Sequence, residues 1–304
     1  MKRLNIYIIG LILFPILLGI VSNREIIVDK EKLLGDDYRL FQKSPAWDLA
    51  KAVEDEDEDK VKEILKKNPK LINYRESKWG MTLLMVATER QQMKAFKILL
   101  DNGADVSIHE RLSGLSALHS ATQNRNIEFV EMLLKHGANP NDVSGPPSEA
   151  NKGYVTTPLI CSAANGRIDM MKLLLKSGAL INMAVGRYKW TPLHEAVVQD
   201  QLEAILFLLE NGADYKSPIC YRPDFSIPSE LEDPNDMGEP IYLVNELRRQ
   251  TFILGSSHHK QKMKIVDFLE KRGIDYKSVP IPPYTLKYIK EEYPKSWKQY
   301  IDEY

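Results

Sequence analysis

The sequence predicts an all-α fold, a solenoid of about five to six helix-turn-helix repeats with short hairpin loops and a degenerate C-terminal cap. Three observations predict it. A Leu-Leu-x-x-Gly-Ala phrase recurs along the chain, a second phrase that begins with Thr or Ser precedes each copy, and the spacing between the two phrases is constant. Such self-similarity is typical of stacked repeats, because each helix pair can bury its apolar face only against its neighbours.

The Leu-Leu-x-x-Gly-Ala phrase predicts where the second helix of each repeat ends. Its glycines are Gly103, Gly137, Gly178 and Gly212, which are 34, 41 and 34 residues apart. Helices commonly end at a residue with a left-handed backbone, and glycine adopts that conformation without a steric penalty. The middle step is seven residues longer. We interpret the extra residues as an insertion between repeats, because the spacing inside each repeat is unchanged.

The second phrase predicts the first helix of each repeat. Its copies are Thr82–Ala87, Ser116–Ala121, Thr157–Ser162 and Thr191–Ala196, and the last residue of each lies 12 residues before the next Leu pair. Thr and Ser cap helix N-termini, and Pro in the next position loses no hydrogen bond there. The small residue that ends the phrase lets the paired helices approach closely.

Thr191–Ala196 reads Thr-Pro-Leu-His-Glu-Ala and matches the ankyrin-repeat signature T-P-L-H-x-A in full. The chain resembles ankyrin-repeat proteins over residues 45–276. The resemblance implies a concave recognition surface made of hairpins and first helices, and structural hydrogen bonds near the turn for His119 and His194. The repeat boundaries that we predict are 45–78, 79–112, 113–153, 154–187, 188–236 and 237–276.

Both ends of the array depart from the pattern, as terminal repeats do. An acidic run, Glu54–Asp59, joins the two helices predicted for the first repeat. We interpret it as a solvated turn near a helix N-terminus, with a site for a cation or a basic partner as the alternative. At the other end Glu239-Pro240-Ile241 replaces Thr-Pro-Leu, and the aromatic tail of residues 277–304 is predicted to cap the stack.

The N-terminal residues predict export. Lys2 and Arg3 precede a 16-residue apolar run, Ile6–Val21, which is the arrangement of a signal peptide. As a helix the run would be about 24 Å long, short for a hydrocarbon core of about 30 Å. We therefore predict that residues 1–22 are a cleaved signal peptide, with an uncleaved membrane anchor as the alternative, and that residues 23–44 are a polar linker. Either form places the repeats outside the cytoplasm: periplasmic, secreted or membrane-anchored.

Composition and motifs argue against nucleic-acid binding and catalysis. The 41 basic and 42 acidic residues nearly cancel, whereas a nucleic-acid binder usually carries a basic excess. The sequence has no phosphate loop, nucleophile motif or zinc motif, so we predict no enzyme activity, no cofactor and no metal. His258-His259 lacks a partner at ligand spacing and is predicted to lie in a surface loop. Cys161 is predicted to be buried, with a Cys161–Cys220 disulfide as the alternative in an oxidising compartment.

Aromatic and arginine side chains on the hairpins are the candidate partner-binding residues, because Trp, Tyr and Arg are the types most enriched in interface hot spots. Insertions at 142–155 and 215–238 enlarge the hairpin side, where solenoid binding faces often lie. Trp190 is predicted to pack against the neighbouring hairpin; for Trp79, packing and partner contact are both open. The candidates are Arg75, Trp79, Arg111, Tyr154, Arg187, Tyr188, Tyr221 and Arg222.

The predicted function is that of an exported, monomeric, non-enzymatic scaffold that binds a protein through its hairpin tips and concave face. It would touch a membrane only through residues 4–22, and only if these are not cleaved. A sharper hypothesis is a resemblance to ankyrin-type immunity proteins, which neutralise toxins; a secreted effector directed at a host is the rival. Two alternatives come from other classes: a structural anchor of an envelope complex, and an enzyme whose site lies in residues 215–304 as a separate domain.

Overall fold

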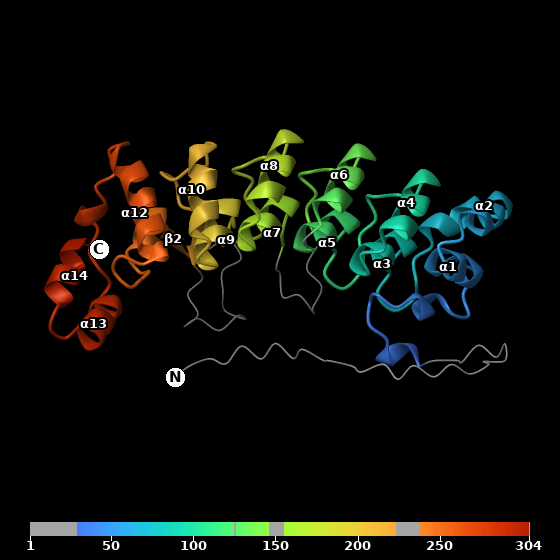
Figure 1. Ribbon diagram of the computed structural model, residues 1–304, viewed down its shortest axis with the longest axis horizontal. Coiled ribbons are helices and arrows are strands. Elements are labelled where there is room, and N and C mark those ends of the chain that lie inside the picture. The colour runs from blue at the N-terminus through green and yellow to red at the C-terminus, as the bar shows by residue number, and fades with distance from the viewer. Residues whose placement is uncertain (1–28, 125, 146–154, 223–237, 304) are drawn as a thin grey trace.

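The computed structural model describes residues 29–124, 126–145, 155–222 and 238–303. In these ranges six helix pairs stand side by side in chain order, and two further helices follow them (Figure 1). The pairs are α1 (Trp47–Glu54) with α2 (Glu58–Lys67), α3 (Leu83–Glu89) with α4 (Met93–Asp101), α5 (Ala117–Gln123) with α6 (Ile127–Lys135), α7 (Pro158–Ala164) with α8 (Ile168–Lys176), α9 (Pro192–Val198) with α10 (Leu202–Glu210), and α11 (Leu243–Leu247) with α12 (Ser257–Glu270). The last two helices are α13 (Pro283–Glu292) and α14 (Trp297–Glu303).

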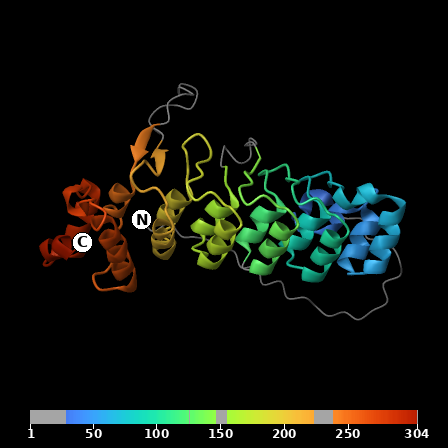
Figure 2. The ribbon, with the colours of Figure 1, turned by 90° about the horizontal axis from the view of Figure 1, so that it is seen from above.

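Short elements connect the pairs. The 3₁₀ helices of the described chain are η1 (Lys30–Lys32), η2 (Tyr38–Phe41), η3 (Pro69–Asn73) and η4 (Tyr276–Ser278). Strands β1 (Cys220–Arg222) and β2 (Glu239–Ile241) pair antiparallel, with Cys220 opposite Ile241. This small sheet joins the fifth pair to the sixth and lies on the hairpin side of the stack (Figure 2).

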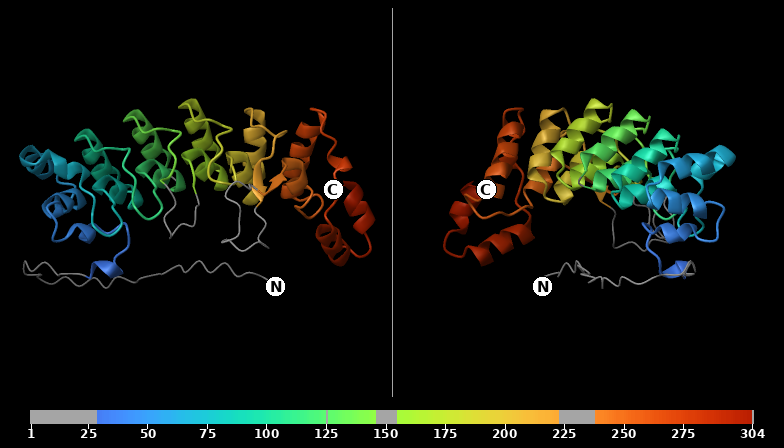
Figure 3. Two further views of the ribbon diagram at one scale, coloured as in Figure 1. Left: turned by 180° about the vertical axis from the view of Figure 1, so that it is seen from behind. Right: turned by 45° about the vertical axis from the view of Figure 1, so that its right-hand side comes forward.

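The helices form two rows along the stack. The first helices of consecutive pairs pack against one another, α3 on α5, α5 on α7 and α7 on α9, and the second helices form the other row (Figures 1 and 3). The hairpins extend from the side of the first helices (Figures 1 and 2). This architecture confirms the predicted all-α repeat solenoid, to which the two-stranded sheet is a minor addition.

Hydrogen bonds from the Thr-Pro-Leu phrase fix the starts of the first helices. The Oγ1 atoms of Thr82, Thr157 and Thr191 accept from backbone N–H groups three residues on, at 3.3, 3.2 and 3.1 Å. Ser116 and His119 form a capping box at the start of α5. These bonds satisfy N–H groups that a helix start otherwise leaves without partners, so the predicted caps are confirmed.

The Leu-Leu-x-x-Gly-Ala phrase ends the second helices by one repeated geometry. The glycine turns left-handed, with φ of 83° at Gly103 and 95° at Gly212. The turn lets the following alanine N–H donate back to the carbonyl of the first leucine, at 3.0 Å for Ala104 and 2.9 Å for Ala213. The leucines themselves are fully buried in one continuous core that runs through the stack, so the phrase both ends a helix and fills the core. They are Leu99, Leu133, Leu174 and Leu208.

The segment predicted as a polar linker, 23–44, belongs to the folded core over its second half, so that prediction needs correction. Tyr38, Leu40 and Phe41 of η2 are fully buried, and η2 packs against α1. The Tyr38 hydroxyl donates to Gln92 Oε1 at 2.9 Å. The Lys78 ammonium group donates to three carbonyls at the start of the segment, the shortest bond being 2.7 Å to Glu31. Three apolar side chains in one 3₁₀ turn anchor a segment whose average composition is polar.

The acidic run Glu54–Asp59 is the turn between α1 and α2. The Asp57 carboxylate accepts from Lys60 N–H at 3.0 Å and caps α2, and Glu58 pairs with Lys62 one helical turn later at 2.5 Å. Glu56 lies 3.6 Å from Lys94 of the next pair. Helix capping and surface ion pairs therefore account for these carboxylates, which agrees with the interpretation of the run as a solvated turn.

The C-terminal helices extend the stack at the end where the sequence predicts a cap. Ile289 of α13 and Tyr300 of α14 form a small buried cluster of their own. The Tyr300 hydroxyl donates to the Phe252 carbonyl at 2.6 Å and accepts from Phe252 N–H at 3.1 Å. This pair of hydrogen bonds joins the tail to the loop between α11 and α12.

Several predictions concern residues that the structure does not describe. The apolar run Ile6–Val21, Tyr154 and most of the insertion at 215–238 lie outside the described residues. None of the helices within the described ranges is both long and apolar enough to cross a membrane. Cys161 in α7 and Cys220 in β1 are both buried, and no disulfide joins these two described residues.

Candidate functional site

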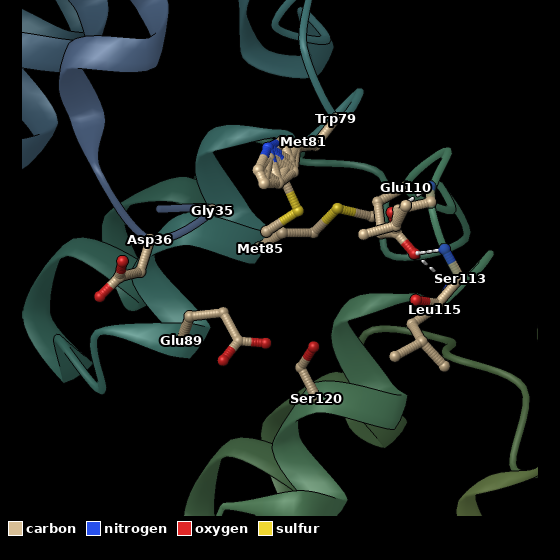
Figure 4. A pocket seen from close by; sticks show the side chains of 11 residues that line it. Gly35, Asp36, Trp79, Met81, Met85, Glu89, Glu110, Ser113, Leu115 and Ser120 are labelled. Carbon is tan, nitrogen blue, oxygen red and sulfur yellow. Dashed lines mark hydrogen bonds between the residues drawn. The ribbon is translucent and has the colours of Figure 1, made fainter. Parts of the chain in front are cut away.

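A pocket of about 310 Å³ opens between α3 and α5 (Figure 4). Its walls come from three parts of the chain: the two helices, the hairpins that precede them, and Gly35-Asp36 of the N-terminal segment. The pocket therefore exists only because two repeats stack and the N-terminal segment folds against them.

The floor of the pocket is apolar. Met81 and Met85 are nearly buried, and Leu115 and Trp79 are half-buried beside them. Leu112 stands at the rim with 46% of its surface exposed. Methionine side chains adapt their shape to different ligands, so this floor suits an apolar side chain from a partner.

The rim of the pocket is acidic. Glu110 is held by its own hairpin, since its carboxylate accepts from the N–H groups of Leu112, Ser113 and Leu115, the latter two at 2.6 and 3.1 Å. The carboxylates of Asp36 and Glu89 have no hydrogen-bond or ion-pair partner among the residues that the structure describes. In Figure 4 the Glu89 side chain reaches across the mouth toward Ser120. Two carboxylates at the edge of an apolar pocket favour a cationic neighbour for the bound group.

Of the predicted partner-binding residues, Trp79 lines this pocket. Its indole Nε1 is buried and has no hydrogen-bond partner among the described residues. The Lys78 ammonium group lies 4.2 Å from the centre of the ring, a cation–π contact. Trp79 therefore packs against its surroundings and lines the pocket, and its contact with a partner stays a prediction.

Arg75 and Arg111 are exposed, but they bind neighbouring hairpins. Arg75 donates to the carbonyls of Gly80 at 3.1 Å and His109 at 2.6 Å. Arg111 donates through Nη1 to the Ser77 carbonyl at 3.0 Å. Each inter-hairpin bond joins residues 34 positions apart, one repeat period. These arginines thus fix the spacing of the hairpins on either side of the pocket.

Arg187, Tyr188 and Tyr221 form a second group, at the hairpin before α9. The Arg187 guanidinium lies 5.5 Å from the Tyr188 ring centre, and the Tyr188 carbonyl accepts from Tyr221 N–H at 2.9 Å. Arg222 ends β1, and its side chain is outside the described atoms. Trp190 is half-buried, packs against the core and stacks on His194 with the ring centres 6.0 Å apart. The predicted residues that can be placed therefore form two separate groups on the hairpin side.

The methionine and leucine residues of the pocket floor could not be predicted from residue type, because these types are not enriched in binding hot spots. A usable signal exists in the repeat itself. Met85 occupies the fourth position of its Thr-Leu-Leu-Met phrase, where the matching phrases carry His119, Ile160 and His194. Two of the four repeats thus carry an apolar residue at this position, and Met85 is the one that lies beside the exposed Leu112.

His119 and His194 behave differently although they occupy matching positions. His119 is buried and makes the structural bonds that the resemblance implies: Nδ1 accepts from Ser116 N–H at 3.3 Å, and Nε2 faces the Thr156 carbonyl at 3.4 Å. His194 departs from the expectation. Its Nδ1 has no hydrogen-bond partner within the described chain, its ring stacks on Trp190, and burial lowers its pKa to about 4.

A polar cluster joins the hairpin before α5 to the hairpin before α7. Both carboxylate oxygens of Asp142 lie 3.1 Å from His109 Nε2. Its Oδ2 also lies 3.5 Å from His119 Nδ1 and 2.6 Å from the Ser116 hydroxyl. The hydrogen bond to Asp142 raises the pKa of His109. Burial acts to raise the pKa of Asp142, but bonds from His109 and Ser116 outweigh it and leave the pKa below its ordinary value.

This cluster was not predicted from the sequence, although His109 and Asp142 are 33 residues apart, one repeat period, and so occupy neighbouring hairpins. The one ligand atom that each of His109, His119 and Asp142 offers lies within 4.8 Å of the other two, so these side chains could hold a metal ion. The cluster does not resemble a hydrolase site, because the Ser116 side chain is buried under the hairpins and donates to the carboxylate. His258 and His259 lie in the first turn of α12, not in the predicted surface loop, because Ser256 caps a helix there.

The family of ankyrin repeats (three copies) matches residues 49–144 and 146–218, more than half of the chain. The chain belongs to the ankyrin repeat family. Ankyrin repeats are protein–protein interaction scaffolds in general, and that general role is the function that the family establishes for this chain. It agrees with a pocket whose floor is apolar and open.

Short stretches of the chain also resemble individual proteins. It is 42% identical over 59 residues to a putative ankyrin repeat protein of Rickettsia bellii (strain RML369-C), which is 19% of this chain and 24% of that protein. It is 37% identical over 60 residues to BRCA1-associated RING domain protein 1 of Caenorhabditis elegans, and 38% over 53 residues to palmitoyltransferase ZDHHC13 of Homo sapiens. These matches cover 20% and 17% of this chain, and each covers 8% of the relative. The likeness to the transferase therefore concerns repeats alone.

Proposed function

We propose that this ankyrin-repeat protein binds a protein partner on its concave face and that the pocket between α3 and α5 receives an apolar side chain next to a Lys or Arg of that partner. One observation carries the proposal: an open apolar floor, made by Met81 and Met85, lies beside the unpaired carboxylates of Asp36 and Glu89 among the described residues. An apolar anchor in a pocket with a polar rim is the usual anatomy of a binding hot spot.

A peptide library displayed on phage tests this proposal, because the pocket itself then selects the ligands that fit it. Peptides selected on the wild-type chain should share a Leu, Ile or Met within two positions of a Lys or Arg. Leu112→Glu, at the exposed rim of the pocket, should weaken their binding by about tenfold or more, because a hot-spot residue contributes about 2 kcal/mol. Glu89→Lys should weaken it as well, through repulsion of the basic residue.

Matched controls separate the pocket from general effects. Leu180 is 60% exposed outside the pocket, and Glu131 is an exposed acid on α6, so Leu180→Glu and Glu131→Lys repeat the same chemical changes elsewhere. Both controls should bind the selected peptides like the wild type. Peptides without basic residues, or equal binding by the Leu112 variant and its control, would contradict the proposed pocket.

We also propose that the protein is exported and acts outside the cytoplasm. The support is the Lys2-Arg3 pair before the apolar run Ile6–Val21. Mass spectrometry of the protein isolated from its own cells tests it: a mature N-terminus near residue 23 is expected, and an intact Met1 in a cytoplasmic fraction would contradict both the signal peptide and the anchor. Neutralisation of a toxin is the sharper form of this proposal, with a host-directed effector as its rival, and an envelope anchor is the alternative that an uncleaved, membrane-bound Met1 would favour.

The enzyme alternative requires residues 215–304 to form a separate domain. Ile241, Leu247 and Ile265 instead belong to the same core as the preceding repeats, and α12 packs against α10. The described part of this region therefore extends the solenoid, which supports a binding function for it as well.

A further inference from the structure

We propose that His109, His119 and Asp142 form a binding site for one Zn²⁺ ion, which links the hairpin before α5 to the hairpin before α7. The three residues offer two imidazole nitrogens and a carboxylate oxygen: His109 and Asp142 lie in consecutive hairpins, and His119 lies in α5. Zn²⁺ prefers this combination, whereas Mg²⁺ and Ca²⁺ prefer sites made of oxygen atoms alone.

Two of the three distances in the cluster are close to those of a tetrahedral zinc site. With bonds of about 2.0–2.1 Å, two ligand atoms of a tetrahedral Zn²⁺ lie about 3.3–3.4 Å apart. Asp142 Oδ2 lies 3.1 Å from His109 Nε2 and 3.5 Å from His119 Nδ1. The two histidine nitrogens are at most 4.8 Å apart, so a small rotation of the partly exposed His109 ring completes the triangle.

The hydrogen bonds around the cluster orient the ligands for a metal. A carbonyl can only accept, so His119 Nε2 carries the proton that faces Thr156 O at 3.4 Å, and Nδ1 keeps its lone pair. The Ser116 hydroxyl has one proton for two acceptors, Asp142 Oδ2 at 2.6 Å and His119 Nδ1 at 2.9 Å. The Ser116 backbone N–H also donates to His119 Nδ1 at 3.3 Å, and His109 Nε2 faces both Asp142 oxygens, so a bound ion would replace these hydrogen bonds. The Thr156 and Ser116 contacts match the outer hydrogen bonds that orient metal ligands.

The site is open on one side only. His119 is fully buried, while 32% of the His109 side chain and 17% of the Asp142 side chain are exposed. An ion can enter from the His109 side, and water completes the tetrahedron there.

The repeat sequence supports a linking role at this junction. At three other junctions an asparagine side chain joins hairpins: Asn73 accepts from Asp105 N–H at 2.8 Å, Asn141 from Leu180 N–H at 2.7 Å and Asn182 from Asp214 N–H at 2.8 Å. Ser107 occupies the equivalent position between these two hairpins, and its hydroxyl bonds within its own turn to Asp105. The His109–Asp142 contact stands where that asparagine link is absent.

Binding of the ion depends on pH, because the metal competes with a proton. Zn²⁺ displaces protons from its ligands, so affinity should be lower at pH 5.5 than at pH 7.5. The charged groups that face His109 are Asp142, Arg75, Glu110 and the neutral or charged His119. Arg75 opposes the cation, and the carboxylates favour it.

A Zn²⁺ titration of the full chain, first treated with a chelator, tests the site. The wild type should bind one Zn²⁺ at pH 7.5 with a Kd of about 1 µM or tighter, and Co²⁺ in its place should give the visible absorption of a tetrahedral complex. Asp142→Asn and His109→Gln should each weaken binding by at least about tenfold. The doubly substituted control, His258→Gln with His259→Gln, should bind like the wild type, as should His136→Gln.

A measurement on the wild-type chain alone tests the site even if a variant misfolds. Zn²⁺ should raise its melting temperature at pH 7.5 and have a smaller effect at pH 5.5. Absence of saturable binding at about 100 µM Zn²⁺, a value that corresponds to less than 6 kcal/mol of affinity, would overturn the site. So would binding that only the His258 and His259 changes abolish.

Discussion

At the scale of single residues, a buried lysine is the least expected feature of the C-terminal repeat. Lys262 of α12 is fully buried, with its ammonium nitrogen 3.0 Å from the Gln250 carbonyl and 5.5 Å from the centre of the Tyr276 ring. Burial, together with the nearby Arg248, lowers its pKa from an ordinary value of 10.5 to about 6. The Lys262 amine is therefore neutral in the folded chain at pH values where it is protonated in the unfolded chain.

This pKa shift predicts a pH dependence of stability. Between pH 10.5 and about 6 the unfolded state binds the Lys262 proton and the folded state does not, so this residue destabilises the fold increasingly as pH falls through that window. Lys262→Met keeps the side-chain volume and removes the titration. The melting temperature of the variant, relative to the wild type, should be highest near pH 6 and should decline toward pH 9.

Lys264→Met is the control for that comparison, because Lys264 is exposed on the same helix. Its melting temperature should run parallel to that of the wild type from pH 6 to pH 9, since surface substitutions change stability by about 0.5 kcal/mol or less. Parallel curves for Lys262→Met as well would show that the buried amine is charged at all these pH values.

At the scale of elements, the N-terminal segment is a structural part of the first repeats. Phe41 is fully buried and lies 6.3 Å from the Tyr74 ring, and Tyr38 bonds to Gln92. We predict that Phe41→Ala destabilises the chain by about 3–5 kcal/mol in urea unfolding, the usual effect for a buried phenylalanine. Leu34→Ala, at a residue 73% exposed in the same segment, should change stability by about 0.5 kcal/mol or less. Equal effects of the two variants would restore the linker interpretation.

Helix pairs were predictable where the chain repeats and unpredictable where it does not. The glycine turns and threonine caps follow from local chemistry, so the phrases around Gly103 and Thr191 predict them directly. Folding of the N-terminal segment depends on α1, a contact that no local pattern reports. The pocket is harder still, since Asp36, Met85 and Leu112 come from three elements that meet only after stacking.

The cluster of His109, His119 and Asp142 shows that the repeat period also predicts contacts between residues outside the repeat signature. His109 and Asp142 are one period apart, as are Arg75 and His109, and each pair is in contact across neighbouring hairpins. Residues at equal positions of consecutive repeats are neighbours in a solenoid whatever their type. Comparison of equivalent positions in consecutive repeats identifies the cluster from the sequence, whereas the spacing of metal-ligating residues within one repeat does not.

At the scale of the whole molecule, the chain is a row of units that contact their neighbours, with a tail that has its own small core. Leu133 sits in the continuous core, while Tyr300 belongs to the separate cluster of α13 and α14. In such one-dimensional folds the effect of a substitution depends on its position along the row. A change in the middle removes support from the pairs on both sides, whereas a change in the tail acts on the end alone.

Hydrogen exchange measured by mass spectrometry can separate these two cases. Leu133→Ala should cost about 2–5 kcal/mol and speed exchange in α3 to α8, because Leu133 is fully buried between neighbouring pairs. Tyr300→Ala removes both hydrogen bonds to Phe252 and should speed exchange in residues 283–303 while α3 to α10 stay protected. Tyr300→Phe, which keeps the ring and loses only the hydroxyl, should have the smaller effect of the two. Uniformly faster exchange along the chain after the Tyr300→Ala change would mean that the tail and the repeats unfold as one cooperative unit.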